Sequence, residues 1–157
     1  MKEPYIRITD QALDPEEITR RVRGPSKGSV ITFLGTARNE TAGRPVLFLE
    51  YEAYEGMVIN TITIISFELQ KAWGPLDMAF AHRIGRVNVG EISMVVAIAT
   101  PHRKEGFTAS WSAVDQIKLT APIWKKEVYE DGSSWVGCDN EHLNPIADAV
   151  HLEKSPY

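Results

Sequence analysis

Apolar positions along the chain recur with two periods, one of two residues and one near 3.6, which predict strands and helices in turn. Alternating or continuous apolar segments, rich in β-branched and aromatic residues, predict five strands: residues 5–9, 28–37, 45–54, 77–84 and 91–100. The last of these is almost wholly apolar from Met94 to Ala99, so we expect it in the centre of its sheet.

Three segments between these strands carry helical signals. The sequence Asp-Pro-Glu-Glu at 14–17 combines an N-cap, a first-turn proline and a capping-box glutamate, and predicts a helix to about residue 23. Residues 55–73 bear an apolar stripe with spacings of three and four, which indicates a second helix. A third stripe begins after Pro101 and ends at Ala121-Pro122, where proline forbids continuation.

Large aromatic rings mark the third helix and the segment after it. Phe107, Trp111, Val114 and Ile117 follow helical spacing, and Trp124 comes shortly after the helix. Rings at such spacing usually pack inward, so we expect Phe107, Trp111 and Trp124 to belong to the core.

The remaining segments complete the predicted architecture. Residues 39–44 read as a polar loop, and Asp131-Gly132 predicts a two-residue turn between strands at 123–130 and 133–137. Residues 138–157 form a polar tail with weak patterning. Strands that alternate with helices and end in a hairpin indicate an α+β domain with helices packed on a sheet. We therefore expect a single domain over 1–157, with a core at 1–137.

Length and charge narrow the class of protein. A chain of 157 residues with 43% hydrophobic residues can bury the core of one ordinary domain. Its net charge of −4 argues against a protein that coats nucleic acid. No segment has the length of a membrane span or of a signal-peptide core, so we expect a cytoplasmic protein that binds neither membrane nor nucleic acid.

Familiar catalytic motifs are missing from the sequence. It contains no phosphate-loop glycine pattern, no G-x-S-x-G, no H-E-x-x-H and no paired C-x-x-C. The four histidines lack metal-ligand spacing, so we predict no metal site and no cofactor. Cys138 is the single cysteine, and a structural role suits it better than a nucleophilic one.

One segment reverses the charge of the chain. Residues 102–126 contain five basic and two acidic side chains and so carry +3, which leaves −7 for the rest. A solvated helix face is the ordinary explanation. The alternative is an anion site, because His102 and Arg103 stand at a helix start, where free N–H groups attract anions. Lys118 and Lys125 lie further along, and a pocket between these elements would suit a phosphate and a carboxylate.

Several segments together resemble one family, the large catalytic subunit of molybdopterin synthase, or MoaE family. The resemblance covers roughly residues 28–136. It rests on the order and spacing of these segments: ITFLGTARNETAG, LEYEAYEGM, AHRIGRVNVGE, the His-Arg pair at 102–103, DQIK at 115–118 and APIWKKE at 121–127. It implies an α/β hammerhead fold with an added small antiparallel β subdomain.

The resemblance also implies an activity and its partners. A small ubiquitin-like sulfur-carrier subunit of the MoaD type presents a C-terminal thiocarboxylate, and the enzyme moves its sulfur onto cyclic pyranopterin monophosphate. Two transfers form the dithiolene of molybdopterin. Family members are homodimers within a heterotetramer that includes the small subunit.

Site residues follow from the same resemblance by matching positions. Lys118 and Lys125 match the catalytic lysines, and Phe33 matches an aromatic residue near the pocket. The substrate-binding positions match Thr36, Ala37, Arg38, His102, Arg103, Lys126 and Glu127, together with the two lysines. We expect Arg38, His102 and Arg103 to meet the phosphate and pterin, and the two lysines to polarise the thiocarboxylate.

One departure from the family pattern leaves an alternative open. Related sequences carry an arginine shortly after the closing Trp-Val, thought to reach the neighbouring subunit's pocket, whereas Gly137-Cys138-Asp139 stands here. A non-catalytic paralogue that binds the small subunit or a phosphorylated ligand would tolerate this loss. A module that binds phosphate or RNA through residues 102–126 is a further alternative, which the net charge disfavours.

Overall fold

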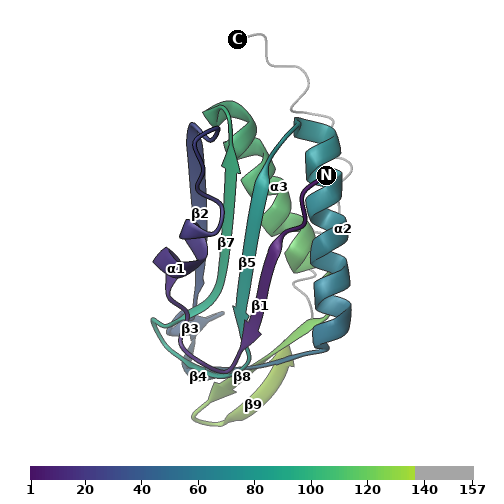
Figure 1. The fold of residues 1–157 in the computed structure, drawn as a ribbon. Coiled ribbons are helices and arrows are strands. Elements are labelled where there is room, and N and C mark those ends of the chain that lie inside the picture. The colour runs from purple at the N-terminus through teal and green to yellow at the C-terminus, as the bar shows by residue number, and fades with distance from the viewer. Residues whose placement is uncertain (137–157) are drawn as a thin grey trace, which may run out of the picture.

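A computed structural model describes residues 1–136, which build two β-sheets and three helices (Figure 1). The strands are β1 (Tyr5–Thr9), β2 (Ser29–Thr36), β3 (Glu40–Thr41), β4 (Arg44–Ala53), β5 (Asp77–Arg83), β6 (Gly85–Asn88), β7 (Ile92–Thr100), β8 (Ile123–Tyr129) and β9 (Gly132–Val136). The helices are α1 (Pro15–Arg20), α2 (Glu55–Trp73) and α3 (Arg103–Thr120). The predicted α+β class is confirmed.

The first sheet has the strand order β1-β5-β7-β2. β1 and β5 are parallel, and the other pairs are antiparallel. β7 lies between β5 and β2, and its residues from Ser93 to Thr100 are all buried, which confirms the predicted central strand. A strand covered on both faces has no polar face, which explains its continuous apolar sequence.

Helices cover both faces of this sheet. On one face α2 and α3 pack on the side chains of Phe80, Val96 and Ile98. On the other face Ile18 of the short helix α1, and Val22 just after the helix, pack on mostly small residues of β5 and β7 (Figure 1). Alternate strand residues point to opposite faces, so one apolar strand supplies both cores.

The second sheet joins β3, β4, β8 and β9 in that order, and β6 also pairs with β4. It gathers where α3 ends, at the lower edge of the molecule in Figure 1. Val46, Leu49, Val87 and Tyr129 form its own small core. The polypeptide passes from α3 through Ala121-Pro122 directly into β8, which brings the end of the helix against this sheet.

Two local predictions were wrong in their bounds. The first helix ends at Arg20, not near residue 23. After it the backbone makes hydrogen bonds that span three residues instead of four, from Arg21 N–H to Ile18 O (3.1 Å) and from Val22 N–H to Thr19 O (3.3 Å). The closing turn is Glu130-Asp131, because Gly132 already pairs with Tyr129.

The predicted loop at 39–44 is a tight hairpin. β3 pairs with the start of β4 across Ala42 and Gly43, which both have positive φ, 50° and 77°. β6 was also missed, because it is four residues long and contributes one buried side chain, Val87. Both short strands exist through pairing with β4, which local sequence does not show.

The expected burial of the aromatic residues is wrong. Phe107, Trp111 and Trp124 are 66%, 56% and 45% exposed. α3 instead presents a face of small residues, Gly106, Ala109, Ser110 and Ala113, together with Ile117, to the sheet. A Cβ on Gly106 would lie 2.8 Å from Thr100 Oγ1 and 2.9 Å from Ser29 Oγ, so the helix backbone approaches too closely for rings to fit between.

Two further predictions concern the limits of the chain. The polar tail at 138–157 and Cys138 lie outside the described residues, and the division into a single domain stays a prediction. None of the helices within residues 1–136 has the length and apolar character that crossing a membrane requires.

Candidate functional site

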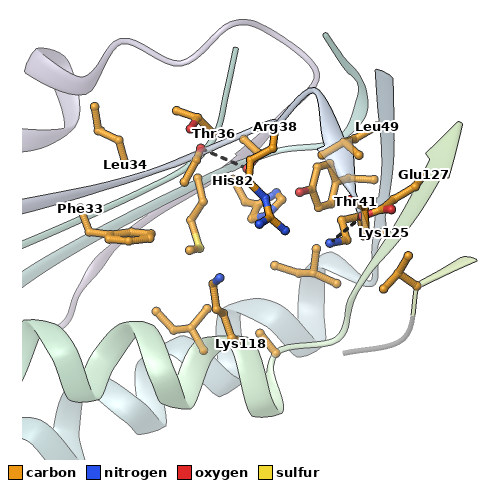
Figure 2. Close-up of a pocket in the computed structure, with 18 residues that line it drawn as sticks. Phe33, Leu34, Thr36, Arg38, Thr41, Leu49, His82, Lys118, Lys125 and Glu127 are labelled. Carbon is orange, nitrogen blue, oxygen red and sulfur yellow. Dashed lines mark hydrogen bonds and ion pairs between the residues drawn. The ribbon is translucent and has the colours of Figure 1, made fainter. Parts of the chain in front are cut away.

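A cavity of about 460 Å³ opens where the two sheets meet the C-terminal end of α3 (Figure 2). Its walls come from the end of β2, from β4, β5 and β7, from the last turn of α3 and from β8. This size suits a ligand of the dimensions of a drug or a nucleotide.

The β2 wall is shaped by an irregularity in the sheet. The pairing of β2 with β7 shifts register between Gly35 and Thr36, and Ser93 Oγ donates a hydrogen bond to the Gly35 carbonyl (3.2 Å). A bulge re-aims the side chains that follow it. Thr36, directly after the irregularity, lines the cavity together with Phe33 and Leu34, which precede it.

Backbone hydrogen bonds anchor the segment that carries Arg38. Ala37 N–H donates to the Glu91 carbonyl (3.0 Å), and Gly90 N–H donates to the Ala37 carbonyl (2.8 Å). The Ala37 side chain is buried in the small core of the second sheet. Arg38, the next residue, extends its guanidinium into the cavity toward Lys118 (Figure 2).

The opposite wall supplies two lysines. Lys118 lies in the last turn of α3 and points up into the cavity (Figure 2). Lys125 and Glu127 alternate along β8 and so share one face of the strand. Tyr51 and Leu49 stand directly opposite them on β4, and all four residues line the cavity.

Glu127 is the buried carboxylate of the site, with 2% of its surface exposed. Its Oε1 lies 3.2 Å from Lys125 Nζ, and its Oε2 accepts a hydrogen bond from the Tyr129 hydroxyl. Burial by itself raises the pKa of Glu127, but hydrogen bonds from Tyr129, Lys125 and Thr41 outweigh burial and hold the pKa below its ordinary value. Glu127 is therefore ionised and fixes the position of the Lys125 ammonium.

His82 lines the cavity from β5 and is 5% exposed. Its Nδ1 donates a hydrogen bond to the Arg83 carbonyl (2.8 Å), and its ring meets Tyr51 edge-on at 4.8 Å between centroids. Burial lowers the pKa of His82 to about 4, although the bond to Arg83 acts against it. The imidazole is therefore neutral at pH 7.

The structure brings together six of the predicted site residues. Phe33, Thr36, Arg38, Lys118, Lys125 and Glu127 all line the cavity. Sequence reasoning missed His82, Tyr51, Thr41 and Ser93. His82 stands within the AHRIGRVNVGE motif, but a lone histidine in an apolar strand carries no local sign of facing a cavity.

Four predicted residues lie elsewhere in the single chain. Ala37 is buried and contributes through its backbone. Lys126 points to the other face of β8, where its Nζ lies 3.5 Å from Glu50 Oε2. His102 and Arg103 stand at the start of α3, and 15 residues of helix place Arg103 about 22 Å from Lys118. The expected pocket shared by these two residues and the lysines is therefore not formed within one chain.

This arrangement favours an anionic ligand. Arg38, Lys118 and Lys125 carry positive charge into one partly enclosed cavity, where Coulomb attraction is stronger than in bulk water. Glu127 is already occupied by three donors and repels an anion less than a free carboxylate would. Within residues 1–136, no group of three His, Cys, Asp or Glu side chains is placed to hold a metal ion.

Fold and site together define an α+β protein whose two sheets and helix end enclose a cation-lined cavity. Residues 8–120 match the family model described as MoaE protein, and the chain belongs to the MoaE family.

Curated relatives agree with this assignment. The molybdopterin synthase catalytic subunit of Bacillus subtilis (strain 168) is 40% identical over 130 residues, which is 83% of each chain. The human protein of the same name is 38% identical over 132 residues, 84% of this chain and 70% of that protein.

Solved structures show the same fold. Molybdopterin synthase from Staphylococcus aureus matches with a TM-score of 0.80 and 35% identity, over 87% of this chain and 98% of that one. A complex of subunits 1 and 2 of the molybdopterin-converting factor from Helicobacter pylori 26695 matches with a TM-score of 0.67 over 94% and 98% of the two chains, and its 19% identity supports the fold alone.

Proposed function

We propose that this chain is the catalytic subunit of a molybdopterin synthase. It takes sulfur from the C-terminal thiocarboxylate of a small ubiquitin-like subunit of the MoaD type and transfers it to cyclic pyranopterin monophosphate, which becomes the dithiolene of molybdopterin. The observation that carries the proposal is the convergence of Arg38, Lys118 and Lys125 in one cavity of a MoaE-family chain.

The charges of the reactants fit this cavity. The substrate bears a phosphate and the small subunit presents an anionic tail, so both need fixed cations. Arg38 is assigned to the phosphate, because its bidentate guanidinium suits phosphate oxygens. Lys118 and Lys125 are assigned to the thiocarboxylate, since they approach the cavity from α3 and β8.

Each transfer forms two bonds and breaks two, apart from bonds to hydrogen. The thiocarboxylate sulfur bonds to a substrate carbon while a carbon–oxygen bond of that carbon breaks and its oxygen leaves, and water then adds to the carbonyl carbon of the resulting thioester. The carbon–sulfur bond of the tail breaks, the sulfur stays on the substrate, and the tail leaves as a carboxylate. The two ammonium groups stabilise the negative charge on the carbonyl oxygen during this step.

Glu127 supports the reaction through Lys125. Its carboxylate lies 3.2 Å from Lys125 Nζ and is itself held by Tyr129. The ammonium is thereby positioned before substrate arrives, which avoids the cost of ordering it during the reaction.

A homodimer within a heterotetramer accounts for His102 and Arg103. Phe107 and Trp111 are exposed near the middle of α3, between Arg103 and Lys118. A two-fold axis perpendicular to α3 at this aromatic face pairs the helix with its copy in antiparallel orientation. The start of one helix then lies beside the end of the other, where the predicted phosphate contacts of His102 and Arg103 become possible across the interface.

The experiment combines the chain with thiocarboxylated small subunit and cyclic pyranopterin monophosphate and measures dithiolene product. Lys118→Ala is expected to lower the rate by about a hundredfold or more. Lys71→Ala is the matched control, because Lys71 occupies the last turn of α2 and does not line the cavity. Thermal unfolding of both variants checks that the fold is retained.

Two outcomes contradict the proposal in different ways. Full activity of Lys118→Ala would overturn the role of this lysine. Wild-type protein that binds the small subunit but forms no product would favour the non-catalytic paralogue.

A further inference from the structure

His82 belongs to the cavity but has no part in the sulfur chemistry proposed above. Its two ring nitrogens have different surroundings. Nδ1 faces the Arg83 carbonyl at 2.8 Å, and a carbonyl oxygen can only accept, so Nδ1 carries the hydrogen. Nε2 of the neutral ring is consequently a hydrogen-bond acceptor.

The edge that carries Nε2 is open to the cavity. Within residues 1–136 the structure gives Nε2 no hydrogen-bond partner. Three side-chain polar atoms of these residues are fully buried without a partner, namely Arg83 Nε, Glu105 Oε2 and Ser110 Oγ. His82 Nε2 is not one of them, so this atom is accessible. His82 and Arg38 both line the cavity, and Figure 2 labels both.

Nε2 of His82 differs from the charged groups of the cavity in its capacity to accept a hydrogen bond from a ligand. Arg38, Lys118 and Lys125 donate and do not accept. Glu127 accepts, but Tyr129, Lys125 and Thr41 already donate to three of its about four acceptor positions. Tyr51 packs its ring against the imidazole, which fixes the plane of the ring.

We infer that His82 is a specificity residue, whose Nε2 accepts a hydrogen bond from an N–H group of the pterin ring while Arg38 binds the phosphate. This inference rests on the proposed function, which supplies the substrate class. A reduced pterin bears N–H donors on its rings, and phosphate has no N–H group. A site that pairs an acceptor with an N–H group rejects ligands without one.

Two substitutions separate binding from structure. The amide nitrogen of His82→Asn takes the place of Nδ1 and keeps the bond to the Arg83 carbonyl, but nothing replaces Nε2. The amide oxygen of His82→Gln reaches the position of Nε2 and keeps the acceptor, but the bond to Arg83 is lost. If His82 has a purely structural role, His82→Gln should weaken pterin binding more than His82→Asn does. If Nε2 binds the pterin, His82→Asn should weaken binding more.

Calorimetry measures the affinity of wild type, His82→Asn and His82→Gln for cyclic pyranopterin monophosphate, for inorganic phosphate and for the small subunit. His82→Asn is expected to bind the pterin about tenfold more weakly, which corresponds to about 1.4 kcal/mol. His82→Gln is expected to stay within about threefold of wild type. Affinity for phosphate and for the small subunit is expected to be unchanged in both.

Three results overturn the inference or its basis. Equal pterin affinity in His82→Asn and wild type refutes the role of Nε2. Selective loss of small-subunit affinity would assign Nε2 to the backbone of the tail instead and equally refutes it. Wild type that fails to bind the pterin while the small subunit binds contradicts the proposed function itself. Thermal unfolding of both variants excludes loss of the fold as the cause.

Discussion

Replacing Glu127 by glutamine tests whether the buried carboxylate organises the site. The change preserves size and removes the charge that Lys125, Tyr129 and Thr41 share. Hydrogen bonds to charged groups contribute about 1.5–3 kcal/mol, against about 1 kcal/mol for neutral ones. With three such bonds at a side chain that is 2% exposed, the free energy of unfolding should fall by about 3 kcal/mol.

The matched control lies on the same pair of strands. Glu50 forms an ion pair with Lys126 at 3.5 Å, but the two side chains are 42% and 29% exposed. Solvent screens this pair, so Glu50→Gln should cost about 0.5 kcal/mol or less. The two variants therefore compare the same chemistry at different burial.

Urea unfolding at a fixed protein concentration measures both variants, because self-association would otherwise alter apparent stability. The expected loss for Glu127→Gln lowers the midpoint of thermal unfolding by about 6–12 °C. Since the pKa of folded Glu127 lies below its ordinary value of 4.5, the charge stabilises the fold above about pH 4.5. This advantage disappears as pH falls through the folded pKa.

A loss below about 1 kcal/mol at pH 7, or one no larger than that of Glu50→Gln, would refute this role of the carboxylate. A difference between wild type and Glu127→Gln that does not narrow under acid would refute it equally. In either case Glu127 would not be the group that positions Lys125.

Other parts of the structure give three further predictions. Gly106→Ala should lower the free energy of unfolding by about 2 kcal/mol, because the added methyl group clashes with Thr100 and Ser29. The control Gly56→Ala, in open space on α2, should raise it by about 0.5 kcal/mol. Urea unfolding compares the two variants, and equal effects would contradict the close approach of α3. Burial lowers the pKa of His82 from 6.5 to about 4, so the free energy of unfolding of wild type should fall by about 3 kcal/mol as pH falls from 6.5 to 4, since the unfolded state binds the extra proton. Urea unfolding at a series of pH values should show a weaker pH dependence of this free energy for His82→Gln. The same pH dependence in both proteins would contradict the prediction. Trp111→Ser should weaken self-association in sedimentation experiments, because the ring is exposed on α3. The free energy of unfolding of the monomer should change by less than about 1 kcal/mol. Unaltered self-association would rule out the aromatic face of α3 as the dimer interface.

Local signals predicted the elements that local forces determine. The second helix occupies Glu55–Trp73 as expected, because its stripe, Val58, Ile62, Ile65 and Leu69, is buried and Gly74 ends it. β1 also has its predicted bounds, and the Asp14 side chain accepts from Glu16 N–H as a cap should. Period, caps and glycine act within a few residues, so the sequence displays them directly.

Long-range pairing decided what the sequence did not show. β6 and β3 depend on β4, and α3 packs through small residues because Gly106 lets its backbone approach β2 and β7. The rings of Phe107 and Trp111 are therefore left outside, although their spacing suits a buried stripe. Helical periodicity shows which residues share a face of the helix, but not which of these faces packs on the sheet.

The candidate site shows the same division. Family motifs in the sequence identified Arg38, Lys118 and Lys125, and the tertiary structure places all three on one cavity. The separation of these cations from His102 and Arg103 by the length of α3 is a consequence of the fold. So is the contribution of His82, since a strand buried on both faces hides from the sequence which of its side chains borders a cavity.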